Sequence, residues 1–73
     1  MKINWSAREV DVFLSLAETL SFRRTALQMH LSQSAVSRQI QALEEALGVS
    51  LFVRRTRALS LTPEGERLYR LAS

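Results

Sequence analysis

Apolar side chains recur at helical spacing in three stretches of the chain. Over residues 33–47 the apolar positions are Val36, Ile40, Leu43 and Leu47. These four fall within a narrow arc when successive residues are turned by about 100°. Over residues 7–19 the stripe consists of Val10, Phe13, Leu14, Ala17 and Leu20. A shorter stretch, from residue 22 or 23 to 29, has Phe22, Ala26 and either Met29 or Leu27 for its buried side. The spacing predicts three helices.

Residues that favour helix ends lie at the boundaries of these stretches. Ser6, Ser21 and Ser32 are predicted N-caps, because a serine hydroxyl accepts hydrogen bonds from the free amides of a first turn. Glu9 completes a capping box with Ser6, and Trp5 is expected to pack against the first helix. Gly48 suits the left-handed position that ends the third helix.

The pattern changes to strand character after Gly48. Residues 49–53 are mostly apolar and rich in strand formers, and residues 59–61 alternate with a period of two. The arginine-rich segment 54–58 lies between them, so the sequence predicts a β-hairpin over about residues 51–61. Thr62 as N-cap and Pro63 at the first helical position then predict a last helix, which Leu68 and Leu71 continue.

Length and composition exclude several classes of protein. A chain of 73 residues forms one domain, and the absence of cysteine excludes disulfides and thiolate metal sites. The single histidine, His30, cannot build a metal site alone. Glu44 and Glu45 point about 100° apart on a helix and are therefore poorly placed to act as a general acid–base pair. No apolar run approaches the roughly 18 residues of a membrane span. We therefore expect a cytoplasmic protein that is not an enzyme and binds no metal, cofactor or membrane.

The positive charge is concentrated in the middle of the chain. The net charge is +3, yet residues 23–57 alone hold six arginines against two glutamates. Arg23 and Arg24 lie at the start of the second helix, where the helix dipole disfavours cations and free amides attract anions. Clustered arginine of this kind is typical of proteins that bind a polyanion.

The polar face of the third helix is graded along its length. Its first turns carry uncharged hydrogen-bonding side chains and one cation, whereas the acids Glu44 and Glu45 come in its last turns. Three helices with a tight second connection and a basic hairpin indicate a mainly α fold, a winged helix-turn-helix with a three-helix core and a two-stranded β wing. Such a fold places one helix in the major groove of DNA.

The candidate contacts follow from that fold. The expected contacts to bases or the major groove are Gln33, Ser34, Ser37, Arg38 and Gln41. The expected phosphate contacts are Arg23, Arg24, Thr25, Ser32 and Arg54. The wing residues expected at the minor groove are Arg55, Thr56 and Arg57, because narrow A·T-rich minor grooves attract arginine.

The motifs also resemble a known family. The segments Ser21-Phe22-Arg23-Arg24-Thr25-Ala26 and His30-Leu31-Ser32-Gln33-Ser34-Ala35-Val36-Ser37-Arg38-Gln39-Ile40 are similar to the N-terminal domain of LysR-type transcriptional regulators. The resemblance continues through Leu43-Glu44-Glu45, Leu47-Gly48-Val49, Leu51-Phe52, Arg54 and Leu61-Thr62-Pro63-Glu64-Gly65. Ser34, Thr25 and Val53 depart from the pattern, which frequently has proline, alanine and an acid at these positions.

The resemblance implies a bacterial, sequence-specific transcription regulator. It implies a DNA-binding domain over residues 1–62, with the helix-turn-helix at about residues 23–42. Residues 63–73 would begin a linker helix that dimerises, so that a homodimer binds an interrupted palindromic operator. Because members of the family continue into a domain that senses a small molecule, the chain is expected to lack this effector-binding domain, either as a fragment of a longer regulator or as a naturally short product.

One alternative from another functional class remains open. A winged helix could serve as a protein-interaction module that does not bind DNA. The first two turns of the third helix argue against this reading, because they carry no acid and no exposed aromatic or aliphatic anchor of the kind that protein interfaces use.

Overall fold

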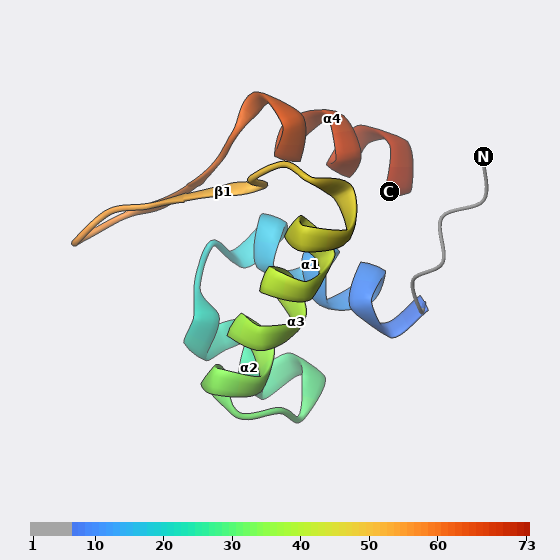
Figure 1. Ribbon diagram of the computed structural model, residues 1–73. Helices are drawn as coiled ribbons and strands as arrows, with labels where there is room; N and C mark the ends of the chain where they lie inside the picture. The colour runs from blue at the N-terminus through green and yellow to red at the C-terminus, as the bar shows by residue number, and fades with distance from the viewer. Residues whose placement is uncertain (1–6) are drawn as a thin grey trace.

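The computed structural model describes residues 7–73 and contains four helices and a two-stranded sheet (Figure 1). The elements are α1 (Ala7–Thr19), α2 (Phe22–Met29), α3 (Gln33–Leu47), β1 (Phe52–Arg54), β2 (Leu59–Leu61) and α4 (Pro63–Ala72). The predicted mainly α winged helix-turn-helix is confirmed. The expected roles of Trp5 and Ser6, and with Ser6 the capping box, lie outside the described residues.

Side-chain caps begin three of the helices where the sequence predicts them. Ser21, Ser32 and Thr62 accept hydrogen bonds from the backbone N–H groups of Arg24, Ala35 and Gly65 at 3.0–3.1 Å. Gly48 ends α3 with a φ of 71° and donates its N–H to the Glu44 carbonyl oxygen. These local bonds fix the ends of α2, α3 and α4 and so determine which side chains each helix exposes.

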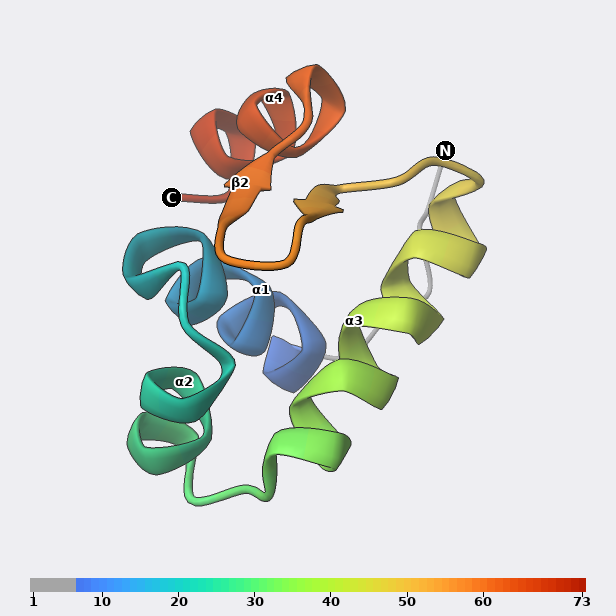
Figure 2. The ribbon, with the colours of Figure 1, turned by 90° about the vertical axis from the view of Figure 1, so that its left-hand side faces the viewer.

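The core lies around α1, which contacts α2, α3 and α4 (Figure 2). The predicted stripe on α3 is confirmed, since Val36, Ile40 and Leu43 are buried and Leu47 is half-buried. On α2, Met29 is half-buried and Leu27 is 68% exposed, which resolves the choice that the sequence left open.

The predicted stripe on α1 is wrong in part. The side chains buried there are Val12, Phe13, Ser15 and Leu16, whereas Val10, Leu14 and Ala17 are half-buried. Leu20 follows the end of the helix with a φ of 52° and is 42% exposed. The reason is that α1 packs against three helices, so its buried arc is wider than a single stripe. The buried Ser15 hydroxyl donates a hydrogen bond to Oε1 of Gln28, which allows a polar side chain in this arc.

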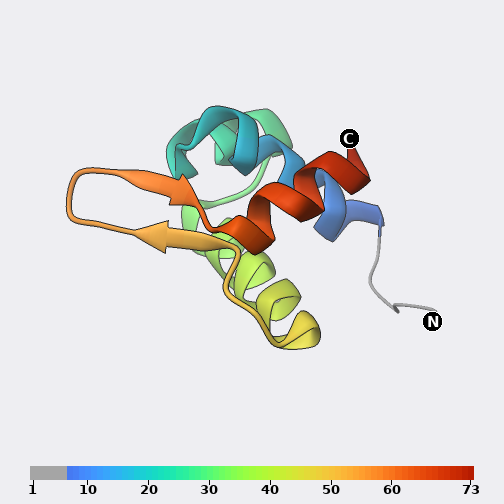
Figure 3. The same cartoon turned by 90° about the horizontal axis from the view of Figure 1, so that it is seen from above.

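The hairpin projects away from the helices (Figure 3). Its strands pair antiparallel, with Phe52 opposite Leu61 and Arg54 opposite Leu59. The first strand begins later than the sequence pattern suggests, because residues 49–51 form the connection from α3. In this connection the Leu51 carbonyl oxygen accepts a hydrogen bond from the Thr62 N–H, and the Ser50 carbonyl oxygen accepts one from the Thr62 hydroxyl.

The last helix packs against the start of this hairpin and against α1. Gly65 is buried beside the carbonyl oxygen of Leu51, and the Tyr69 hydroxyl donates a 3.0 Å hydrogen bond to Glu18 of α1. Over residues 7–73, none of the helices combines the length and the hydropathy that crossing a bilayer requires.

Candidate nucleic-acid interface

The polar side chains predicted to read bases lie on one face of α3. Gln33, Ser34, Arg38 and Gln41 are exposed, and Ser37 is half-buried, whereas Val36 and Ile40 face the core. Ser34 lies 3.2 Å from the capping hydroxyl of Ser32. The structure thus brings these five predicted residues together over the first turns of the helix.

The connection between α2 and α3 sets the angle at which this face is presented. His30 adopts the left-handed conformation, with φ of 56°, and Leu31 donates its N–H to the Ala26 carbonyl oxygen at 2.9 Å. Because the αL residue ends α2 and turns the chain sharply, only Leu31 and Ser32 separate His30 from the start of α3 at Gln33. His30 therefore has a structural role in the turn.

The start of α2 presents two cations but not the neighbouring threonine. Arg23 and Arg24 are exposed, and Thr25 is completely buried. The Thr25 hydroxyl pairs with that of Thr19 at 2.9 Å, and its backbone N–H donates to Ser21. The predicted phosphate contact of the Thr25 side chain is therefore wrong, because position 25 faces α1. Phe22, Thr25 and Met29 are three and four residues apart and so lie on the same face of α2. This spacing is the sequence signal that could have predicted the burial of Thr25.

The wing carries its arginines at an exposed tip. Arg54, Arg55, Thr56 and Arg57 are all exposed. Backbone hydrogen bonds between Arg55 and Ala58, at 2.9 and 3.4 Å, close the tip and hold the flanking side chains outward.

Most of the interface arginines are free to meet an anion. Within the part of the chain that the structure describes, the side chains of Arg23, Arg24, Arg38, Arg55 and Arg57 make no hydrogen bond or ion pair with the protein. A guanidinium group offers five donors in a planar fork that matches phosphate and the edge of guanine. The arrangement is chemically suited to a polyanion with readable polar edges.

Arg54 differs from these five. Its guanidinium carbon lies 5.0 Å from the centroid of the Phe22 ring, and its Nη1 donates a 3.3 Å hydrogen bond to Ser37 Oγ. The last residue of β1 is thereby joined to the start of α2 and to the polar face of α3.

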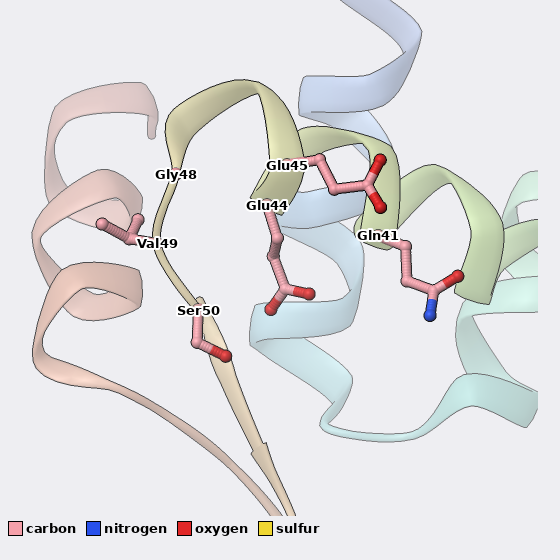
Figure 4. A pocket seen from close by; sticks show the side chains of 6 residues that line it. All are labelled: Gln41, Glu44, Glu45, Gly48, Val49 and Ser50. Carbon is pink, nitrogen blue, oxygen red and sulfur yellow. The ribbon is translucent and has the colours of Figure 1, made fainter.

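The far half of α3 has a structural function that sequence reasoning missed. Figure 4 shows the Glu44 and Glu45 side chains beside Gln41, Val49 and Ser50, around a pocket at the end of the helix. The Glu44 carboxylate accepts hydrogen bonds from the backbone N–H groups of Leu51 and Phe52, at 2.8 and 3.3 Å. No local sequence pattern predicts this contact, because the N–H groups of Leu51 and Phe52 belong to a segment that folds back onto the helix.

Known proteins are similar to this chain in sequence and in fold. Residues 7–66 match the family described as "Bacterial regulatory helix-turn-helix protein, lysR family". The HTH-type transcriptional activator IlvY of Salmonella typhimurium is 54% identical over 61 residues, which cover 84% of this chain and 21% of IlvY.

Two solved structures with DNA have the same fold. The BenM DBD/catB site 1 DNA complex matches with a TM-score of 0.88 and 38% identity, over 93% of this chain and 76% of that chain. Vibrio fischeri DarR in complex with DNA matches with a TM-score of 0.89 and 32% identity, over 94% of this chain and 24% of that chain.

The similarity covers one part of these longer proteins. The chain spans about a fifth of the length of the curated relatives it matches. Over that part, the sequence match extends from α1 into α4 and so includes the helix-turn-helix and the wing. The chain belongs to the lysR family of bacterial regulatory helix-turn-helix proteins, and it comprises the winged helix-turn-helix of that family.

Proposed function

We propose that this chain binds double-stranded DNA with sequence specificity and serves a bacterial transcription regulator. The first turns of α3 enter the major groove, where Gln33, Ser34, Ser37, Arg38 and Gln41 meet base edges. Phosphate contacts come from Arg23, Arg24 and Ser32, and wing contacts to the minor groove or the backbone come from Arg55, Thr56 and Arg57.

The observation that carries this proposal is the set of free arginines around an acid-free polar helix face. Arg23 and Arg24 lie at the start of α2, Arg38 is on α3, and Arg55 and Arg57 are at the wing tip. Three separate elements therefore present cations with no protein partner in the described residues. The DNA in the BenM and DarR structures supports the same ligand for this chain.

We further propose that the chain acts as a homodimer on an interrupted palindrome, with α4 as the start of the dimerising helix. Leu71 on α4 is 78% exposed. It lines an apolar groove together with Leu47, Val49 and Leu68. A single small domain covers one half-site, so that a dimer is needed for a symmetric operator.

Fluorescence anisotropy with duplex DNA, titrated against salt, tests DNA binding. If four to six phosphates are neutralised, the logarithm of the affinity should fall with the logarithm of salt at a slope of about −4 to −5. No binding even at low salt would reject the proposal and favour the protein-interaction module. Selection of bound duplexes from a random pool then supplies the operator sequence. Selected sequences that contain only one half-site would reject the proposed homodimer.

A further inference from the structure

The Arg54 side chain bridges the wing and the two helices of the helix-turn-helix. Arg54 ends β1, Phe22 begins α2, and Ser37 lies in the second turn of α3. The guanidinium lies 5.0 Å from the Phe22 ring centroid, within the range of a cation–π contact, and hydrogen-bonds the Ser37 hydroxyl at 3.3 Å. The ring restricts where the guanidinium can lie, and the guanidinium in turn holds the hydroxyl.

This hydrogen bond gives the Ser37 hydroxyl a direction. A serine hydroxyl has one proton to donate and lone pairs that accept. Here a charged nitrogen donates to the oxygen, and the nearby positive charge repels any second donor. The Ser37 hydroxyl can therefore still donate its proton to a partner outside the polar face of α3.

We propose that Arg54 is a positioning residue that makes Ser37 a hydrogen-bond donor towards DNA. The preferred partners of Ser37 are then acceptors, which are guanine O6, purine N7, thymine O4 or a phosphate oxygen. The amino groups of cytosine and adenine are disfavoured at the same place, because they are donors. This inference rests on the proposed DNA binding, and it replaces the expected phosphate contact of Arg54 with an action through Ser37.

Arg54→Lys, Phe22→Leu and Ser37→Ala separate this role from a phosphate contact. Lysine keeps the positive charge that a phosphate needs but has no planar group to stack on the ring. Leucine at position 22 removes the ring and leaves every charge in place. Arg55→Lys is the matched control, because Arg55 is the adjacent exposed arginine and has no side-chain partner among residues 7–73.

The experiment measures the affinity of the full chain for its selected operator, singly and in the double variants with Ser37→Ala. We expect Arg54→Lys, Phe22→Leu and Ser37→Ala each to lower the affinity by roughly three- to tenfold. The double variants should lose little more than Ser37→Ala alone, and the salt slope should stay unchanged. Arg55→Lys should combine with Ser37→Ala multiplicatively.

Opposite outcomes overturn the inference. If the losses for Arg54→Lys and Ser37→Ala multiply, or if Phe22→Leu leaves the affinity unchanged, Arg54 does not act through Ser37. Thermal melting monitored by circular dichroism identifies variants that have lost the fold, and Arg54→Lys, at an exposed position, keeps the test decisive if Phe22→Leu unfolds. Failure of the unaltered chain to bind any duplex would instead reject the proposed function itself.

Discussion

The carboxylate oxygen Oε2 of Glu44 lies 2.8 Å from the backbone nitrogen of Leu51, which donates a hydrogen bond to it. The same oxygen accepts from Phe52, so one side chain of α3 satisfies two successive amides at the entrance to β1. Leu51 and Phe52 are both buried, and water is therefore a poor substitute for this acceptor.

Replacement of Glu44 should destabilise the fold. Glu44→Ala leaves the two amides without their acceptor and should lower the free energy of unfolding by about 1–3 kcal/mol. Glu44→Gln keeps one acceptor oxygen and should lose less. Urea unfolding followed by circular dichroism measures both. Glu45→Ala is the control, since Glu45 is exposed, and equal losses for the two alanine variants would contradict the role of Glu44.

Gly65 should not tolerate a side chain. A Cβ at this position would overlap the carbonyl oxygen of Leu51 and lie 2.9 Å from Cδ2 of Leu61. Alanine normally stabilises a helix by about 1 kcal/mol relative to glycine, but here we expect a net loss of about 1–3 kcal/mol from overpacking. The midpoint of urea unfolding measures this change.

Gly48→Ala provides the comparison for Gly65→Ala. A Cβ added at Gly48 would meet no atom within 4 Å, but the φ of 71° is unfavourable for alanine, so this substitution should cost about 1 kcal/mol through backbone strain alone. A stabilised Gly65→Ala variant would show that α4 does not pack against Leu51 as described.

The tyrosine hydroxyl should titrate above its ordinary range. The hydrogen bond to Glu18 raises the pKa of Tyr69, with further contributions from burial and from the Glu18 charge. Because the folded state holds the proton more tightly, the stability that this bond contributes is complete below pH 10 and is lost as pH rises through the raised pKa.

Ultraviolet absorbance of tyrosinate reports this titration directly, since the chain contains one tyrosine. We expect Glu18→Ala to shift the midpoint of the Tyr69 titration down towards 10. In Tyr69→Phe, the loss of thermal stability at alkaline pH that follows from breaking this hydrogen bond should disappear. An unchanged midpoint in Glu18→Ala would contradict the contact between α1 and α4.

Arg38 should discriminate between bases. Arg38→Ala should cost roughly 1–3 kcal/mol of discrimination at one base-pair position, because a free arginine on the groove face of α3 can pair bidentately with guanine. Anisotropy on operators that differ at single positions measures the effect. Arg70→Ala on α4 is the control. A uniform loss on all sequences would assign Arg38 to a phosphate instead.

Arg57 should sense the sequence that flanks the half-site. Arg57→Ala should weaken binding by roughly three- to tenfold on A·T-rich flanks and less on G·C-rich flanks, because the narrow minor groove concentrates negative potential. Paired duplexes with one half-site and two kinds of flank make the comparison. Equal losses on both flanks would reject insertion into the minor groove.

Local chemistry made the helices predictable. Ser21, Ser32, Gly48 and Thr62 each act within a few residues of their own position, so that the sequence alone determines where α2, α3 and α4 start or end. The same holds for the exposed face of α3, whose opposite side is set by a regular apolar stripe.

The remaining features depend on neighbours that are distant in sequence. The buried arc of α1 follows from three covering helices, and Thr25 is buried because α2 packs against the end of α1. The contacts of Glu44 and Arg54 span seven and more residues and join different elements. No periodicity encodes these contacts of Glu44 and Arg54, which is why the role of Glu44 was missed. For Thr25 the helical spacing of α2 does indicate a buried side chain, but the hydroxyl pair with Thr19 that satisfies it joins two different helices.

The two attachments of β1 to α3 determine how the wing can move. Glu44 holds the start of the strand and Ser37 holds its end, through partners seven residues apart on the helix, about 10 Å along its axis. A single attachment would leave a pivot, whereas two attachments fix both the position and the direction of the hairpin. If α3 and the wing contact one duplex as proposed, we expect the DNA to curve to fit this fixed geometry, so that easily bent sequences bind better even at positions that no side chain touches.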